Sequence, residues 1–471
     1  MVFSSTVFLF VFLPIVLGTY CLCPTPCRNL LLLVASLVFY GWGEPQYIVV
    51  MIFSILFNYA SGVIIDKFKS RDKHKFSRLM LIVSVVGNIG ILGYFKYTDF
   101  ILENINNAFA TSFGMIELAL PIGISFYTFQ TMSYVIDVYR GQVKVQKNII
   151  NFGTYVTLFP QLIAGPIVRY ITIEEQLNHR GRDFDQIANG VRRFIIGLGK
   201  KVLLANQIGA LWDQINIIPT ADLPMATAWL GALAFTFQIY FDFSGYSDMA
   251  IGLGKILGFE FDENFNYPYM SKSITEFWRR WHISLSTWFK EYVYVPLGGN
   301  RKGTARQIFN IFIVWGLTGL WHGASWNFLL WGLYFGVILI IEKVFLLKKL
   351  DEAPEVVSRA YALVLIVLGW VIFAITDMGR MGGYFMALVN VGNIVDNQSL
   401  YLIITNLAVL IILIFASTDI PKKVAMSIMS RLEEKPVLYI IIKNVFYLAI
   451  LIISISFLVS DTYNPFLYFR F

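Results

Sequence analysis

The chain has 471 residues, of which 57% are hydrophobic and only 14% are charged, and its mean hydropathy is +0.65. Soluble domains carry about 25% charged residues, so this composition excludes a water-soluble enzyme. The 37 Lys and Arg residues exceed the 30 Asp and Glu residues, which gives a net charge of +7. In a membrane protein this excess is expected in the loops that orient the chain, and it does not indicate nucleic-acid binding.

Apolar runs of about 18 or more residues recur from end to end, and each is long enough to cross the roughly 30 Å hydrocarbon core of a bilayer. The alternating pattern of a membrane β-barrel is absent from the sequence. We therefore expect an all-α, polytopic membrane protein of about eleven spans, with re-entrant segments among them. The first run, residues 3–20, lacks a basic start and a cleavage site, so it is expected to stay in the protein as a helix.

A basic segment anchors the predicted topology. Residues 66–78 hold six basic and two acidic residues between long apolar runs, so they are expected to form a cytoplasmic loop. Residues 149–168 lie between two basic segments that both belong on this side, and they contain Pro160 and Pro166. This pattern predicts a broken, re-entrant helix. Irregular backbone at membrane depth is tolerated only beside protein or a water-filled cavity, so a cavity is implied.

The second half of the chain is expected to alternate across the membrane by the same rule. Residues 259–306 form a predicted cytoplasmic amphipathic segment, and residues 461–471 a predicted extracytoplasmic tail. The span 307–347 has basic residues at both ends, so it is expected to make two passes that turn near residues 321–323. No linker or repeat divides the sequence, which predicts a single membrane-embedded domain over residues 1–471. The other predicted spans lie near residues 79–96, 117–138, 187–213, 226–258, 357–374, 401–418 and 437–459.

The most informative of the four histidines is His322, which lies in an apolar segment beside Gly319 and Gly323. An ionisable group at membrane depth is costly, so it is a functional residue by default. Burial is expected to keep the imidazole neutral, and a neutral imidazole can take a proton from a hydroxyl. A hydrogen-bonded structural histidine between Trp321 and Trp326 is the other interpretation.

The residues around 273–289 predict an amphipathic helix at the cytoplasmic interface. Ser273 and Glu276 fit a capping box, and large apolar residues follow at helical spacing. The basic surface fits either lipid phosphates or the phosphates of a phosphopantetheine-type acyl donor, and charge alone does not separate the two. The basic residues on the wetter side of this helix and in the loop after it are Arg279, Arg280, Arg301 and Lys302.

Other chemistries find less support in the sequence. Metal catalysis is not expected, because no two histidines stand three or four residues apart. Three acids that fall within predicted spans, Asp137, Asp242 and Asp248, fit two roles. They either hold helices together around a polar cavity or act as coupling sites in a polysaccharide or lipid transporter. A transporter of this kind is often built from two related halves, and no such symmetry is visible in the sequence.

Several long motifs occur in order along almost the whole chain. They are Phe159–Ile167, Phe241–Ala250, Asn264–Tyr269, Phe277–Ser286, Pro296–Arg301 and Gly319–Trp326. With these motifs the chain resembles the membrane-bound O-acyltransferase (MBOAT) family, and within it the branch of alginate and peptidoglycan O-acetyltransferases. The resemblance implies a horseshoe of helices around a thin centre, with His322 as the essential histidine and His282 as the earlier histidine of the pattern. Many relatives carry a further histidine after a later Trp-Gly pair, and residues 331–336 contain none.

The resemblance also implies an activity. It predicts an O-acyltransferase of a bacterial-type plasma membrane that moves an acetyl or other short acyl group toward hydroxyls of an extracytoplasmic polysaccharide. The donor is expected to be a cytoplasmic thioester, either acetyl-CoA or an acyl carrier protein, with no bound cofactor, and a secreted or membrane-anchored acetyltransferase is the expected partner outside. His322 acts as general base and His282 positions or assists the donor. D-alanyl transfer to teichoic acid and fatty-acyl transfer to a lipid are the alternatives.

Two further roles complete the predicted site. Acyl transfer passes through an oxyanion, for which backbone amides near Gly323, the side chain of Asn327 or Trp321 are candidate stabilising or positioning groups. The C-terminal sequence Asn464–Phe471 is similar to the C-terminal motif of the small partner protein in teichoic-acid D-alanylation, where a tyrosine is placed at the outer mouth of an acyltransferase. This resemblance implies that Tyr468 accepts the acyl group transiently or steers the acceptor. An aromatic tail that anchors at the membrane interface is the other interpretation.

Overall fold

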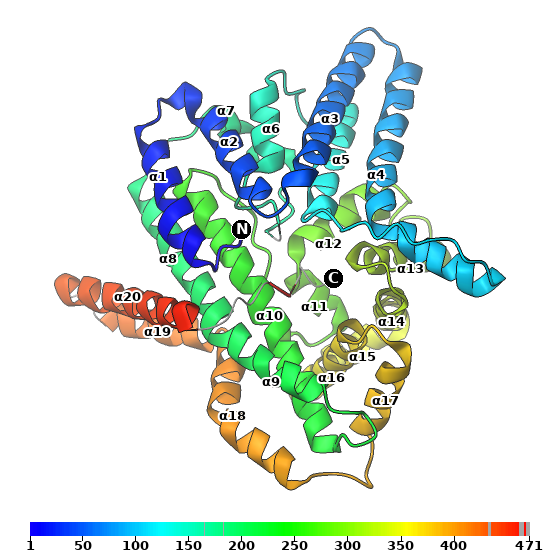
Figure 1. Cartoon of the computed structure of the whole chain (residues 1–471), viewed down its shortest axis with the longest axis vertical. Helices are drawn as coiled ribbons and strands as arrows, with labels where there is room; N and C mark the ends of the chain where they lie inside the picture. Colours follow the sequence, from blue (N-terminus) through cyan, green and yellow to red (C-terminus); the bar gives the residue numbers. More distant parts are fainter. Residues whose placement is uncertain (164, 182, 432–434, 461–465, 468–471) are drawn as a thin grey trace. The chain divides into compact units, whose positions relative to one another are not determined.

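The computed structural model describes residues 1–471 without residues 164, 182, 432–434, 461–465 and 468–471, and in this part every regular element is a helix (Figure 1). The all-α fold expected from the sequence is confirmed. The chain divides into two compact units. The first comprises Met1–Phe194 with Tyr246–Glu263, and the second comprises Ile195–Gly245 with Asn264–Phe471. The single membrane-embedded domain stays a prediction.

The first unit is a set of helices joined by short turns. Its longest pair is α3 (Ile48–Lys69) and α4 (His74–Phe109), which pack on each other and on α5 (Ile124–Arg140). Asn58 on α3 and Asn88 on α4 exchange side-chain hydrogen bonds of 3.0 and 2.8 Å, and such amide pairs hold apolar helices together. The remaining helices are α1 (Leu13–Leu22), α2 (Arg28–Gly41), α6 (Ile149–Thr157), α7 (Tyr170–Asn178) and most of α8 (Phe184–Gly199).

The predicted break in residues 149–168 is present. The helix α6 ends at Thr157, and the next helix begins only at Tyr170. The described residues of the irregular stretch are mostly buried, and the N–H of Phe159 among them donates to the hydroxyl of Ser36 at 3.0 Å. Satisfied partners of this kind are what irregular backbone inside a membrane protein requires.

The second unit contains the central part of the fold. Its helices are α9 (Asn206–Asn216), the first part of α10 (Met225–Ile256), α11 (Ile274–Arg280), α12 (Ile283–Phe289), α13 (Thr304–His322), α14 (Trp326–Ile341), α15 (Leu347–Glu352), α16 (Glu355–Ala374), α17 (Met378–Leu388), α18 (Asn397–Ala416), α19 (Ile420–Arg431) and α20 (Pro436–Ser460). A single hydrophobic cluster runs through α9, α10, α11, α13, α14 and α16 and is rich in tryptophan.

The tightest helix pair of this unit is α13 and α14. The two helices are joined by the short link Gly323–Ser325, which lies where the turn was predicted. A Cβ atom on Gly319 would collide with the carbonyl oxygen of Phe328, and one on Gly332 would collide with that of Trp315. Glycine at these positions therefore lets the two backbones pass within contact distance.

Within the described residues, seven helices are long and apolar enough to cross a membrane. They are Pro45–Lys69, His74–Phe109, Phe184–Asn216, Trp326–Glu352, Glu355–Ala374, Asn397–Ala416 and Pro436–Ser460. Large apolar side chains on α18 and α20 are exposed, as lipid-facing helices require. The chain is therefore polytopic, while the number of spans expected from the sequence stays a prediction.

The acids that fall within predicted spans are buried or paired. Asp242 pairs with Lys201, and Asp248 lies 2.9 Å from the guanidinium of Arg193. Asp137 is 1% exposed in α5. Two of the three therefore hold helices together through a basic partner, which is the structural role considered for them in the sequence.

Candidate functional site

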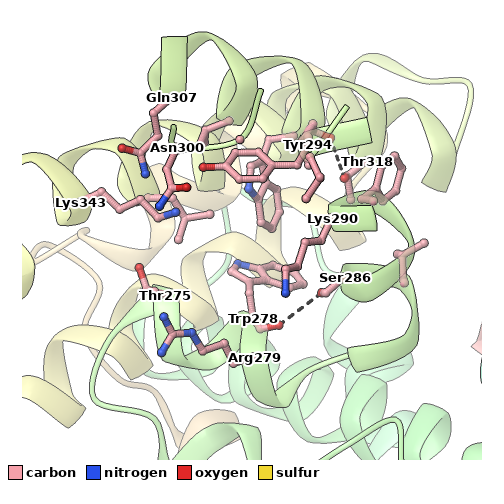
Figure 2. Close-up of a pocket in the computed structure, with 18 of the residues that line it drawn as sticks. Thr275, Trp278, Arg279, Ser286, Lys290, Tyr294, Asn300, Gln307, Thr318 and Lys343 are labelled. Carbon is pink, nitrogen blue, oxygen red and sulfur yellow. Dashed lines mark hydrogen bonds between the residues drawn. The ribbon is translucent and has the colours of Figure 1, made fainter. Parts of the chain in front are cut away.

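A pocket of about 1000 Å³ lies in the second unit, and both histidines singled out by the sequence line it. Its walls come from α11, α12, the helical turn Lys290–Tyr294, the loop 298–302, α13 and the C-terminal part of α14 (Figure 2). Trp278, Trp281 and Trp315 supply much of the apolar wall. An apolar pocket with a few convergent polar groups is the usual form of a ligand site.

His282 stands at a break between two short helices. The sequence predicted one helix over residues 273–289, and this prediction is wrong, because α11 ends at Arg280 and α12 starts at Ile283. His282 has φ +44°, a left-handed conformation that an α-helix cannot contain. Such strain in a non-glycine residue needs surrounding contacts to hold it and is concentrated at functional sites.

Asn264 supplies the contacts that hold the break. Its backbone carbonyl accepts the N–H of Ile283 at 3.0 Å, and its side-chain oxygen accepts the backbone N–H of Ser284 at 3.2 Å. The same side-chain oxygen lies 3.1 Å from Nδ1 of His282. Because that oxygen can only accept, Nδ1 carries the proton of the neutral ring, and the lone pair lies on Nε2.

The predicted start of α11 is confirmed, with one change in its hydrogen bonds. The hydroxyl of Ser273 accepts the N–H of Glu276 at 3.0 Å, as an N-cap does. The carboxylate of Glu276 does not return the bond to Ser273 and instead accepts the N–H of Lys272 at 2.8 Å. It also pairs with Arg280 at 2.8 Å.

The buried surroundings of His282 keep its ring neutral. The residue is 1% exposed and lies outside the helices able to span the membrane. The ring of Phe243 meets the imidazole edge-on at a centroid distance of 4.7 Å. Burial lowers the pKa of His282 from its ordinary value to about 3, because the imidazolium would lose its hydration.

His322 is the last residue of α13. Its ring lies among the aromatic side chains of Trp321, Trp331 and Phe373, at centroid distances of 5.0, 4.9 and 5.2 Å. The residue is 9% exposed and borders the pocket.

The two imidazoles are linked through one tryptophan. The ring of Trp321 lies 5.0 Å from that of His322 and 6.1 Å from that of His282, between centroids. The side-chain amide of Asn327, in contrast, donates to the carbonyls of Ile372 and Phe373 at 3.2 and 3.1 Å. Neither Asn327 nor Trp321 is among the residues that line the pocket. Of the two side chains predicted to stabilise an oxyanion, Trp321 is thus the one that contacts both histidines.

Basic side chains surround the pocket. Figure 2 shows Arg279, Lys290 and Lys343 among its lining residues, and Arg301 and Lys302 also line it. No Asp or Glu is present among the described lining residues, so the charged groups of the lining are all basic, and one of them, Lys290, pairs with Glu291 at 4.0 Å. Arg280, which the sequence grouped with these cations, lies outside the lining and pairs with Glu276. The pocket therefore suits a ligand with several phosphates.

A buried carboxylate missed by the sequence analysis fixes α11. The two oxygens of Glu342 accept the backbone N–H groups of Ile274 and Thr275, each at 2.7 Å, and the residue is 0% exposed. The bonds satisfy amides at the start of the helix that leads to Arg279 and His282. A single acid directly after the apolar run Ile338–Ile341, and before Lys343, was the only signal available in the sequence.

Tyr468, the predicted acyl acceptor or relay, lies outside the described residues. Phe466 and Leu467, just before it, are described and buried, with 1% and 5% exposure.

Comparison with known proteins agrees with these features. A model of the membrane-bound O-acyltransferase family matches residues 142–375, a range that contains both histidines and the pocket. The chain is 45% identical to a probable alginate O-acetylase AlgI of Azotobacter vinelandii over 401 residues, which is 83% of this chain and 79% of the relative.

Two other relatives agree. The chain is 48% identical to a probable alginate O-acetylase AlgI of Pseudomonas aeruginosa over 383 residues, covering 79% of this chain and 72% of the relative. It is 35% identical to the peptidoglycan O-acetyltransferase of Helicobacter pylori over 408 residues, covering 79% and 77%. The resemblance stated from the sequence motifs is confirmed: the chain is an integral membrane enzyme that belongs to the membrane-bound O-acyltransferase family.

Proposed function

We propose that this chain moves an acetyl or similar short acyl group from a cytoplasmic thioester to hydroxyls of a polysaccharide outside the plasma membrane. The observation that carries this proposal is that His282 and His322 line one pocket whose charged lining residues are all basic. The names of the relatives, alginate O-acetylase and peptidoglycan O-acetyltransferase, support acetyl as the group and a polysaccharide as the acceptor.

His322 is the proposed general base. Its Nε2 or Nδ1 takes the proton from the attacking hydroxyl as the oxygen forms a bond to the thioester carbonyl carbon. The tetrahedral intermediate then expels the thiolate, which receives that proton, so the ester forms as the C–S bond breaks.

His282 is the proposed positioning residue for the donor. The hydrogen bond to Asn264 leaves an acceptor at Nε2, which suits a bond from an N–H or O–H group of the thioester. Trp321, whose ring lies near both imidazoles, is the proposed side chain that orients the carbonyl oxygen for attack.

The basic lining is the proposed binding surface for the phosphates of the donor. Acetyl-CoA and an acylated carrier protein share a phosphopantetheine arm, and both fit this chemistry. Arg279, Arg301 and Lys302 line the pocket as expected, and Lys290 and Lys343 enlarge the set. Guanidinium and ammonium groups bind phosphate through charge-assisted hydrogen bonds.

Two further steps complete the proposal. Tyr468 accepts the acyl group transiently or steers the acceptor, and a secreted or membrane-anchored acetyltransferase completes the transfer to the polysaccharide. This division of labour explains how a donor confined to one side of the bilayer serves an acceptor on the other.

The test measures thiol release from acetyl-CoA and from an acetylated carrier protein by the purified chain in lipid nanodiscs. His322→Ala is expected to lower the rate by about 10²- to 10⁴-fold, as loss of a general base does. His74→Ala is the matched control, because this histidine is exposed, with its side chain 69% accessible. Full activity in His322→Ala would remove the proposed base, and a D-alanyl thioester as the sole substrate would replace acetyl as the group transferred.

A further inference from the structure

A buried ion pair in the second unit holds the last described part of the chain. Lys201, in the helical turn Lys200–Ala205, pairs with Asp242 on α10, and the two side chains are only 3% and 4% exposed. The other carboxylate oxygen of Asp242 accepts the backbone N–H of Leu467 at 2.7 Å. The ammonium group of Lys201 lies 4.7 Å from the centre of the Phe466 ring. Both members of the pair therefore contact Phe466–Leu467, which we call the C-terminal segment.

These contacts seat the segment inside the unit. A carboxylate that accepts a backbone N–H makes a charge-assisted hydrogen bond, and an ammonium over an aromatic face is attracted most strongly where water is excluded. Phe466 and Leu467 are 1% and 5% exposed, and Leu467 belongs to the same hydrophobic cluster as Trp281 and Trp370. Phe466 and Leu467 are therefore as buried as residues of the hydrophobic core.

The ion pair has no part in the pocket. Neither Lys201 nor Asp242 lines it. Two charges removed from water are costly unless further hydrogen bonds satisfy them, and at membrane depth such groups are functional by default. The N–H of Leu467 and the ring of Phe466 are the added contacts that the tail supplies.

The helix that carries Asp242 also supports the candidate site. The ring of Phe243, the next residue, meets the ring of His282 at 4.7 Å, and the ring of Tyr240 lies 6.1 Å from that of Trp281. One turn of α10 therefore contacts the wall of the pocket and the C-terminal segment together. This turn gives a physical route by which a seated tail is held at a fixed position relative to His282.

We propose that Lys201 and Asp242 form an intramolecular docking site for the C-terminal segment. With Phe466 and Leu467 they make up what we call the tail latch. The latch fixes the chain at Phe466 and Leu467, and passage of the acyl group from the pocket to the acceptor is expected to depend on it. This catalytic consequence rests on the proposed function, whereas the docking itself does not.

The first experiment measures docking without any acyl transfer. The double variant Lys201→Met/Asp242→Leu removes both charges, so it leaves no lone buried charge and is expected to fold. It also removes the acceptor of the Leu467 N–H and the cation beside Phe466. Carboxypeptidase treatment of the purified chain, followed by intact mass, is expected to stop before Leu467 in the parent chain and to proceed past it in the double variant. Equal digestion of the two would overturn the proposal.

Two further variants keep this experiment selective. Asp248→Asn is the matched control, because Asp248 lies on the same helix and pairs with Arg193, while the described tail residues bond to Asp242. Its digestion is expected to match the parent. Lys201→Met/Asp242→Asn keeps an oxygen that can accept the Leu467 N–H, so intermediate digestion is expected. Digestion past Leu467 in the Asp248→Asn control, to the same extent as in the double variant, would show a general loss of packing and overturn a specific latch.

The second experiment measures whether O-acetylation of the polysaccharide depends on the tail latch. A chain truncated before Phe466 and the Lys201→Met/Asp242→Leu chain are each expected to lower the O-acetyl content of the exported polysaccharide by roughly tenfold or more, as loss of positioning does. Their combination is expected to add nothing, because both remove one interaction. Multiplied losses in the combined variant, or parent-level acetylation in both single changes, would overturn the positioning role. Absence of acetyl-CoA turnover in the parent would contradict the proposed function alone, since carboxypeptidase digestion still decides the latch.

Discussion

The side-chain oxygen of Asn264 accepts the Nδ1 proton of His282 across 3.1 Å, although the two residues are separated by 18 positions in the chain. The same oxygen accepts the backbone N–H of Ser284 at 3.2 Å and its hydroxyl at 2.9 Å. One amide thus fixes both the helix break and the tautomer of a histidine that lines the pocket. Removing it is expected to affect both the helix break and the position of the proton on the ring.

Asn264→Ala is expected to lower kcat/KM for the thioester by about tenfold or more, because the proton is no longer held on Nδ1. Asn264→Asp is the matched change, since a carboxylate accepts the same hydrogen bonds, and it is expected to retain more activity than Ala. The comparison uses initial rates of thiol release at several donor concentrations. A larger loss of kcat/KM in Asn264→Asp than in Asn264→Ala would contradict the role of Asn264 as a hydrogen-bond acceptor.

The titration of His282 predicts a pH dependence of stability. Its pKa is about 3 in the folded chain and near 6.5 when the ring is in water, so at intermediate pH the unfolded chain binds a proton that the folded chain does not. The contribution of this group to the free energy of unfolding is therefore fully present above pH 6.5 and is lost as the pH falls toward 3, at up to about 1.4 kcal/mol per pH unit. Thermal unfolding measured between pH 7 and pH 4.5 is expected to show a shallower decline in His282→Gln than in the parent. Parallel declines would contradict a buried neutral ring.

Two glycines on α13 allow a controlled test of the close contact between α13 and α14, near the end of the helix that carries His322. A Cβ on Gly319 would collide with the carbonyl oxygen of Phe328, while one on Gly316 would meet nothing within 4 Å. Gly319→Ala is expected to destabilise the fold by about 1–3 kcal/mol and to lower activity. Gly316→Ala is expected to be neutral or stabilising by up to about 1 kcal/mol. Thermal unfolding and thiol release on both variants check this, and equal behaviour of the pair would contradict the close helix approach.

These contacts show where sequence reasoning reaches its limit. The N-cap at Ser273, the turn near residues 321–323 and the break after Thr157 follow from signals within a few residues, and all three were predicted from the sequence. The break at His282 was not predicted, because its left-handed backbone is held by Asn264, outside any local pattern. The carboxylate of Glu342 contacts amides 67 and 68 positions away, which no local spacing encodes. The chemistry-bearing side chains were thus visible, while the groups that hold them were not.

The basic lining of the pocket predicts that a donor with phosphates depends on these cations for binding, whereas a donor without phosphates does not. Arg301→Gln/Lys302→Gln is expected to raise KM for acetyl-CoA by about tenfold with little change in kcat. Phosphate contacts that are equally strong in the bound substrate and in the transition state affect only binding. S-acetyl-N-acetylcysteamine, a thioester without phosphate, is expected to show the same KM with both proteins. Lys422→Gln/Lys423→Gln is the control, because it removes the same charge from exposed positions of α19. A KM increase for the phosphate-free thioester would contradict phosphate binding by these residues.

Glu342 does not line the pocket, but it holds the start of a helix that does. Its carboxylate holds two backbone N–H groups at the start of α11, at 2.7 Å each, so Glu342→Ala leaves both donors buried without that acceptor. Each such donor costs roughly 1–3 kcal/mol, and the free energy of unfolding is expected to fall by about 2 kcal/mol or more. Glu342→Gln is expected to fall between Ala and the parent, because one oxygen still accepts while the amide NH₂ faces the other donor.

Glu342→Ala is also expected to alter the pocket, because α11 supplies part of its wall. That helix leads directly to Arg279 and His282, so loosening its start moves a phosphate-binding cation and the positioning histidine together. KM for acetyl-CoA is therefore expected to rise in Glu342→Ala. Glu352→Ala is the control, because this acid is exposed on α15. Thermal unfolding and KM measured on one preparation separate the two effects: a stability loss without any rise in KM would make Glu342 a purely structural residue.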